Sequence, residues 1–206
     1  SIESEAALAI SMRVGNALDN LQDEQQNSFA RIATAIGKYW ICKRAPNHAY
    51  EAMECLGGVG YVEENIMPRI YREAPVNAIW EGAGNVQCLD VLRAMHKEPN
   101  VVDAFLTELA TAQGLDKRFD SFFNSLKDEF VDLSTLEYRS RTVVEKLALG
   151  LQASVLLKDG DEHVAEGFVA SRISGSLGMN SSGLNYGTLP IGVNCKAIID
   201  RAKPQL

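Results

Sequence analysis

One carboxylate stands where the sequence could support proton transfer. Glu81 lies between Trp80 and two nearby glycines, just before a helical pattern begins. An apolar wall disfavours the charged form of a carboxyl group, and a carboxylate in such a place can act as a general base. The alternative is a solvated glutamate near a helix N-terminus, where the helix dipole favours negative charge. The local sequence leaves both interpretations open.

A cluster of glycines marks a second place where a ligand could bind. Gly57, Gly58 and Gly60 fall within residues 57–61. Their lack of a side chain permits close approach, and glycine amides can cradle an anion such as a pyrophosphate. The alternative is a helix C-terminus followed by a tight turn. A Rossmann fingerprint is excluded, because these glycines close a helix, whereas that motif needs a strand before them and a helix after.

The remaining reactive side chains form no pattern of a metal centre or a nucleophilic triad. The three histidines are isolated from one another and from any cysteine or carboxylate pattern, so no metal site is predicted. The four cysteines fit neither a metal knuckle nor a dense disulfide scaffold, and we interpret them as reduced core thiols: Cys42, Cys55, Cys88 and Cys195. Three arginines beside the candidate loops could meet phosphates or serve as surface salt-bridge partners: Arg69, Arg72 and Arg93.

Composition and charge narrow the class of protein. The chain has 206 residues, of which 46% are hydrophobic and 23% charged, as in ordinary globular proteins. Its net charge of −7 provides no global basic field for nucleic acid. It contains no apolar stretch long enough to span a membrane, and its start is acidic, unlike a signal or transit peptide. These features predict a reducing compartment, either the cytoplasm or, in a eukaryote, the mitochondrial matrix.

The elements that would position these residues are helices. Apolar residues recur at helical spacing and strand patterns are almost absent, which predicts an all-α fold, a helical bundle. The expected helices cover residues 3–20, 25–56, 83–96, 101–113, 116–132, 135–157, 161–174 and 193–202. Residues 57–82 are expected to be irregular apart from a helical turn at 69–72, and 175–192 to be extended. Pro46 predicts a kink or a new start, and residues 134–137 resemble a helix-capping sequence.

Several motifs in order between residues 38 and 93 closely resemble the C-terminal helical domain of acyl-CoA dehydrogenases, and most of all its alkylation-response (AidB-type) branch. The motifs are KYWICKRAP at 38–46, ECLGGVGY at 54–61, PRIYREAP at 68–75, WEGAGN at 80–85 and CLDVLR at 88–93. By this resemblance, residues 1–97 would be part of that domain. Residues 98–206 would be the extra C-terminal helices of the branch.

The resemblance implies an activity and a set of site residues. A glutamate at the position of Glu81 removes the α-proton of an acyl-CoA thioester while N5 of FAD accepts the β-hydride. Gly57 and Gly58 would approach the FAD of a neighbouring subunit, and Asn85 would contact its adenosine half. A flavin site shared in this way implies a homotetramer.

The sequence departs from the family pattern in ways that leave alternatives open. Glu54 stands where many members have Gln, and Ala83 where they have Thr or Ser, so two side-chain hydrogen bonds to FAD are not implied here. The family's N-terminal helical domain and middle β-domain do not precede Ser1, so we expect a piece of a longer protein that is inactive alone. The alternatives are a protective or DNA-associated flavoprotein, with Arg93 as a DNA contact, and an oligomerisation module.

Overall fold

The computed structural model describes residues 1–174 and 186–204. Within these ranges the chain is helical and has no strand, which confirms the predicted all-α bundle. The first part of the chain forms α1 (Ile2–Leu18), α2 (Glu24–Cys55), α3 (Gly58–Tyr61), α4 (Met67–Glu73), the 3₁₀ helix η1 (Ala74–Ala78) and α5 (Gly84–Lys97). The second part forms α6 (Asn100–Ala110), α7 (Lys117–Asp128), α8 (Ser140–Asp159), α9 (Glu162–Phe168), the π-helical turn η2 (Val169–Ile173) and α10 (Cys195–Ala202).

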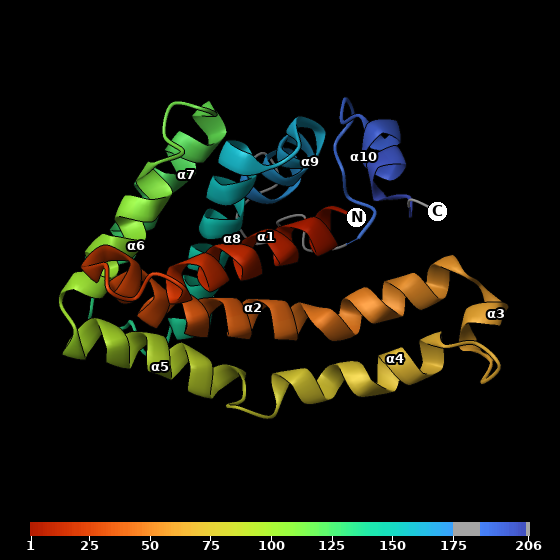
Figure 1. The fold of residues 1–206 in the computed structure, drawn as a ribbon, viewed down its shortest axis with the longest axis horizontal. Helices are drawn as coiled ribbons and strands as arrows, with labels where there is room; N and C mark the ends of the chain where they lie inside the picture. Colours follow the sequence, from red (N-terminus) through yellow and green to blue (C-terminus); the bar gives the residue numbers. More distant parts are fainter. Residues whose placement is uncertain (175–185, 205–206) are drawn as a thin grey trace.

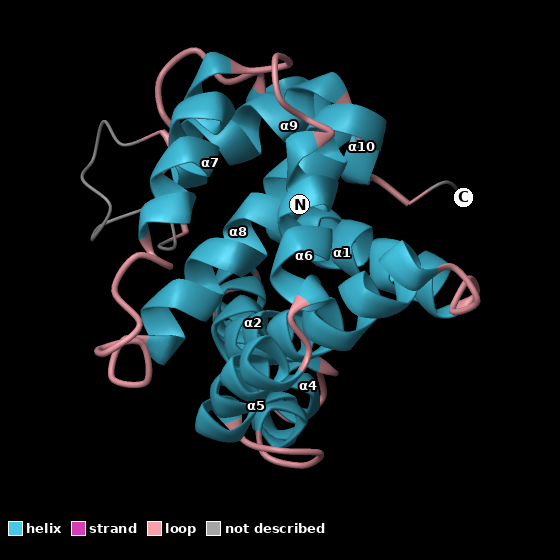
Figure 2. Cartoon of the chain, turned by 90° about the vertical axis from the view of Figure 1, so that its left-hand side faces the viewer, coloured by secondary structure: helices cyan, strands magenta, loops and turns pink. Residues whose placement is uncertain are grey.

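The long helix α2 is the element that organises the molecule. The Asp23 carboxylate caps its first turn by accepting a hydrogen bond from the backbone N–H of Gln26. The helix continues through Pro46, so the predicted new start at this proline is wrong. It spans the molecule, with α4 and α5 on one side and α6 to α9 on the other (Figures 1 and 2).

The core lies around the first half of α2 and along α8. Phe29 of α2 stacks on Phe105 of α6 with ring centroids 6.0 Å apart. Trp40 of α2 is also buried, and its Nε1–H donates to Gln152 Oε1 of α8 at 3.0 Å. Since α8 is buried through most of its length, the helices after residue 97 share one continuous core with α1 and α2.

The second half of α2 forms an arm with α3, α4 and η1 (Figure 1). The sequence predicts this region to be irregular, and that prediction is wrong, because Pro68 and Pro75 stand in the first turns of α4 and η1. Proline is accepted there, since its missing N–H would have no helical partner. Gly60 lets α3 pack on α2, because a Cβ atom at this position would collide with the Met53 carbonyl oxygen.

Two further sequence predictions need correction. Helix α8 begins at Ser140 rather than at 135, because the Asp132 carboxylate accepts from Ser134 and Thr135 and holds them in a turn. All four cysteines are free, but only Cys88 is buried, and Cys55 and Cys195 are exposed. The predicted extended segment 175–192 lies largely outside the described residues. None of the described helices is both long and apolar enough to cross a membrane.

Candidate functional site

The loop between η1 and α5 carries Glu81 in an unusual backbone conformation. Glu81 has a φ of 55°, and among residues 1–174 and 186–204 it is the only non-glycine residue with a positive φ. The left-handed region costs an L-residue roughly 1–2 kcal/mol. The side chains of Glu81 and of Trp80, which is 59% exposed, point to the surface. Within the described residues Glu81 is therefore exposed, as the solvated interpretation predicts, and is not buried against an apolar wall.

Two side chains from neighbouring helices hold this loop. The Lys38 ammonium of α2 donates to the carbonyl oxygens of Trp80 at 2.7 Å and of Gly82 at 2.8 Å. The Gln87 amide of α5 donates to the Glu81 carbonyl oxygen at 2.7 Å. Sequence analysis missed these two residues as parts of the site. Lys38 lies far from the loop in sequence, and no local sequence pattern connects Lys38 with the loop.

Asn85, predicted to contact FAD, lies in the first turn of α5 and meets an arginine from the second half of the chain. Its Oδ1 accepts a hydrogen bond from Arg141 Nε of α8 at 2.6 Å. Gly84 lies beside this arginine and against the ring of Tyr39. Burial raises the pKa of Tyr39 to about 12. Glu81 and Asn85 thus lie at one end of α5, and Arg141 is a further neighbour that the sequence did not reveal.

The two glycines predicted to approach a flavin lie elsewhere, at the tip of the arm where α3 begins (Figure 1). Gly57 has a φ of 61° and ends α2, donating its N–H to the Glu54 carbonyl oxygen at 2.9 Å. This is the helix end and turn that the sequence offered as one interpretation. Both glycines are exposed, with no atom within 4 Å of where their Cβ atoms would lie. Their role towards a flavin stays a prediction.

The arginines beside the candidate loops have carboxylate partners. Arg93 of α5 is 61% exposed and lies 3.4 Å from Asp90, which also pairs with Arg31. Arg69 pairs with Glu73, and Arg72 pairs with Glu63. These contacts agree with surface salt bridges, and a DNA contact by Arg93 stays a prediction.

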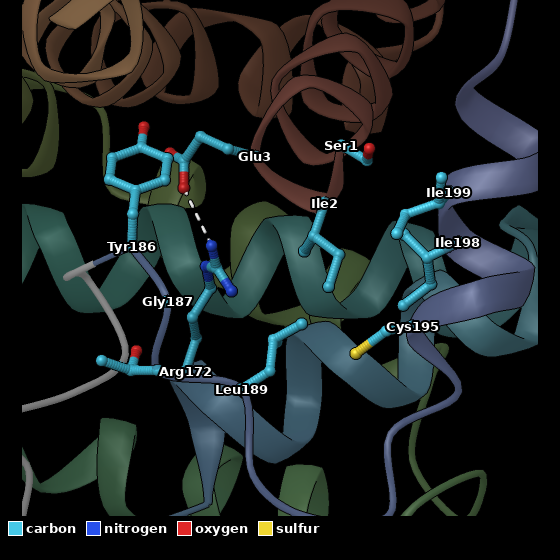
Figure 3. A pocket seen from close by; sticks show the side chains of 11 residues that line it. Ser1, Ile2, Glu3, Arg172, Tyr186, Gly187, Leu189, Cys195, Ile198 and Ile199 are labelled. Atoms are coloured by element: carbon cyan, nitrogen blue, oxygen red, sulfur yellow. Dashed lines mark hydrogen bonds and ion pairs between the residues drawn. The ribbon is translucent and has the colours of Figure 1, made fainter. Parts of the chain in front are cut away.

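A separate cavity of about 280 Å³ opens between the start of α1, η2, residues 186–189 and α10 (Figure 3). Arg172 points into it and donates to Glu3 at 3.0 Å. None of the predicted site residues lines this cavity. Within the part of the chain that the structure describes, no group of three or more His, Cys, Asp or Glu side chains could hold a metal ion.

Comparison with known proteins relates part of this sequence to a family. Residues 1–96 match the family described as "Acyl-CoA dehydrogenase, C-terminal domain". The chain is 41% identical over 129 residues to the "Putative acyl-CoA dehydrogenase AidB" of Escherichia coli (strain K12), covering 63% of this chain and 24% of that protein. It is 33% identical over 148 residues to "Acyl-CoA dehydrogenase family member 11" of Caenorhabditis elegans, covering 71% of this chain and 23% of that protein.

Solved structures agree on the fold. The crystal structure of C. elegans ACDH-11 in complex with C11-CoA matches with a TM-score of 0.76 at 21% identity, over 97% of this chain and 37% of that chain. The apo form of Bd2924 matches with a TM-score of 0.67 at 24% identity, over 75% of this chain and 31% of that chain. At these identities the likeness shows the fold alone, and in both cases it extends to helices beyond residue 97.

Residues 1–96 therefore belong to the acyl-CoA dehydrogenase family as its C-terminal domain. The likeness to AidB that the motifs predict is confirmed by the 41% identity. The chain spans about a quarter of the length of these curated relatives, 24% of one and 23% of the other.

Proposed function

We propose that the chain is the C-terminal part of an FAD-dependent acyl-CoA dehydrogenase in which the Glu81 carboxylate removes the α-proton of an acyl-CoA thioester. One observation carries the assignment. An exposed carboxylate is held in a left-handed conformation at the start of α5, inside the segment that matches the family. A strained residue that its neighbours hold in place is typical of functional sites.

The residues fit a bound flavin in two respects. The turn at Gly57 and Gly58 has open space where side chains would lie, so a planar or anionic group could approach its backbone. The exposed Glu81 has no apolar wall around it in the described part of the chain, and a cofactor with bound substrate would exclude water there. FAD would supply the hydride acceptor when bound, and this chain would supply the base, the glycine turn and Asn85.

A shared site of this kind requires a second subunit. The arm places many large apolar side chains at the surface, including Tyr61, Ile66, Ile70 and Ile79. Exposed apolar groups in such number are typical of a surface that another chain or domain covers. They support the proposal of a homo-oligomer, a tetramer by resemblance to the family.

Replacement of Glu81 by Gln in the full-length protein tests the base. We expect turnover of acyl-CoA to fall roughly 100-fold to 10,000-fold, because the amide cannot accept the proton, while flavin absorbance is retained. Glu64→Gln, at an exposed glutamate between α3 and α4, is the matched control. Unchanged turnover in Glu81→Gln would exclude the base assignment. Visible absorption of the 206-residue chain with added FAD shows separately whether this part alone holds the cofactor.

The DNA-associated alternative has less support. The net charge is −7, and the carboxylate of Asp90 compensates Arg93. Electrostatic binding to DNA weakens steeply with salt, so a titration of duplex DNA at two salt concentrations is the direct test. Salt-sensitive binding that Arg93→Ala abolishes, without acyl-CoA turnover, would favour this alternative.

A further inference from the structure

The backbone around Glu81 needs support from outside the loop. In the loop between η1 and α5, the backbone N–H groups of Ile79 and Trp80 donate hydrogen bonds. Both bonds go to the Val76 carbonyl oxygen of η1. Neither bond constrains the peptide units on the two sides of Glu81. A non-glycine residue in the left-handed region persists when its surroundings over-determine it.

Lys38 supplies that constraint from both sides of Glu81. Its ammonium donates a hydrogen bond to the carbonyl oxygen of Trp80, the residue before Glu81. It donates a second one to the carbonyl oxygen of Gly82, the residue after Glu81. A change in the Glu81 φ and ψ angles would move these two carbonyls relative to each other and break at least one bond. The residues that flank Lys38 on α2, Gly37 and Tyr39, are buried, so its backbone belongs to a rigid element.

The charge of Lys38 has no other strong partner. Throughout residues 1–174 and 186–204, no carboxylate forms an ion pair with it, and its hydrogen bonds go to the two loop carbonyls. Partial burial of a charged ammonium group costs free energy unless polar groups compensate its charge. At this site the dipoles of the two carbonyl groups compensate it. Loop and lysine therefore stabilise each other.

Gln87 completes the arrangement at the third carbonyl. It holds the Glu81 carbonyl oxygen from the first turns of α5, so three consecutive carbonyls point to donors from two helices. Gly82, with a φ of 102°, leaves room for this amide, because a Cβ atom there would lie 2.6 Å from Gln87 Nε2. The Glu81 side chain is left free at the surface.

We infer that Lys38 is a positioning residue for Glu81, which fixes the direction of the carboxylate by bonding the carbonyls on both sides of it. The inference rests on the proposed role of Glu81 as base. A misplacement of about 1 Å in a reacting group can reduce the rate roughly 100-fold. Loss of the Lys38 bonds is expected to act on kcat, because the substrate-binding surfaces remain, and to leave KM nearly unchanged.

Hydrogen exchange on the 206-residue chain tests the structural part. In Lys38→Met, which keeps the aliphatic stem, we expect the hydrogen-bonded amides of Ile79 and Trp80 to exchange about tenfold faster or more, with the amides of α1 and α8 unchanged. Lys38→Arg, which can still donate to two carbonyls, is expected to restore part of the protection. Lys43→Met, at an exposed lysine of the same helix, is the control. Unchanged exchange at Ile79 and Trp80 in Lys38→Met overturns the inference.

Kinetics of the full-length, flavin-loaded protein test the functional part. We expect Lys38→Met to lower kcat roughly 10-fold to 100-fold, with KM within about twofold and partial recovery in Lys38→Arg. An unchanged kcat overturns the inference when Glu81→Gln abolishes turnover. If Glu81→Gln leaves turnover unchanged, the base assignment fails, while the exchange data still decide whether Lys38 holds the loop. Should Lys38→Met not fold, Lys38→Gln, which loses the charge, replaces it in both experiments.

Discussion

Glu3 is a carboxylate whose two arginine partners come from distant parts of the chain. It accepts hydrogen bonds from Arg44 of α2 at 2.9 Å and from Arg172 of η2 at 3.0 Å, and it is only 8% exposed. Burial by itself would raise the pKa of Glu3, but the hydrogen bonds and charges of the two arginines outweigh it and hold this pKa below its ordinary value of 4.5. The ionised form is therefore linked to folding.

The pH dependence of stability follows from this direction. A carboxyl group with a lowered pKa in the folded state stabilises the fold above its unfolded pKa, and this contribution is lost as the pH falls through the folded value. We expect Glu3→Gln to lower the free energy of unfolding by about 3 kcal/mol at pH 7, because two partly buried arginines lose the carboxylate that they share. The difference from wild type should shrink below about pH 4.5, the ordinary value.

Thermal unfolding between pH 3.5 and 7 measures both effects, with buffers spaced by about half a unit. Glu5→Gln is the control, since the Glu5 pair with Arg201 lies at the surface and contributes under about 1 kcal/mol. A pH-independent difference between Glu3→Gln and wild type would contradict the linkage.

Sequence patterns predicted which residues are candidates for the site, but they did not predict the side chains that contact those residues. Glu81 and Asn85 belong to one short motif, so their proximity could be predicted. Lys38 and Arg141 reach the same place from other helices, and helical periodicity says which face a residue occupies without saying which loop crosses that face. The contacts of these two side chains could be known only from the fold.

Among the elements, the short helix α3 packs on α2 through a single glycine, Gly60. Gly60 packs against α2 so closely that a methyl group would meet the Met53 carbonyl oxygen and the Leu56 Cβ, the latter at 2.9 Å. We expect Gly60→Ala to destabilise the chain by roughly 1–3 kcal/mol, as overpacking does. Gly15→Ala in α1, where nothing lies within 4 Å, is the control and should stabilise by up to about 1 kcal/mol. Equal melting curves for the two variants would show that α3 does not need this contact.

Helix positions were predictable where the apolar period was long and unbroken. The patterns of α1, α2, α5 and α10 predict these helices within a few residues of their observed ends. The prediction failed at residues 57–82, where glycine and proline were interpreted as helix breakers although two prolines begin helices. It also failed at the start of α8, where side-chain bonds to Asp132 compete with helical ones.

On the scale of the whole molecule, the buried bond between Trp40 and Gln152 joins the family domain to the helices that follow it. Gln152→Leu keeps the volume but leaves the indole N–H without a partner, so we expect a loss of about 1–3 kcal/mol. Denaturant unfolding followed by tryptophan fluorescence and by far-UV circular dichroism measures it. The two probes should give one transition, because the core is continuous. Gln113→Leu, at the surface, is the control.

Two separate transitions would instead mean that the parts before and after residue 97 unfold independently. The predicted boundary at 97 lies next to the end of the family match at residue 96, yet the packing of α8 on α2 crosses it. The boundary at 97 stays a prediction, and cohesion across it depends on buried side chains far apart in sequence.

The left-handed backbone of Glu81 also bears on how this chain could evolve. Glycine would relieve the strain at that position, and asparagine would reduce it. Selection for thermostability alone would therefore drive the carboxylate out of the loop. With glutamate at position 81, the chain is less stable than its fold allows. A glycine or asparagine there would make it more stable, but would remove the proton acceptor.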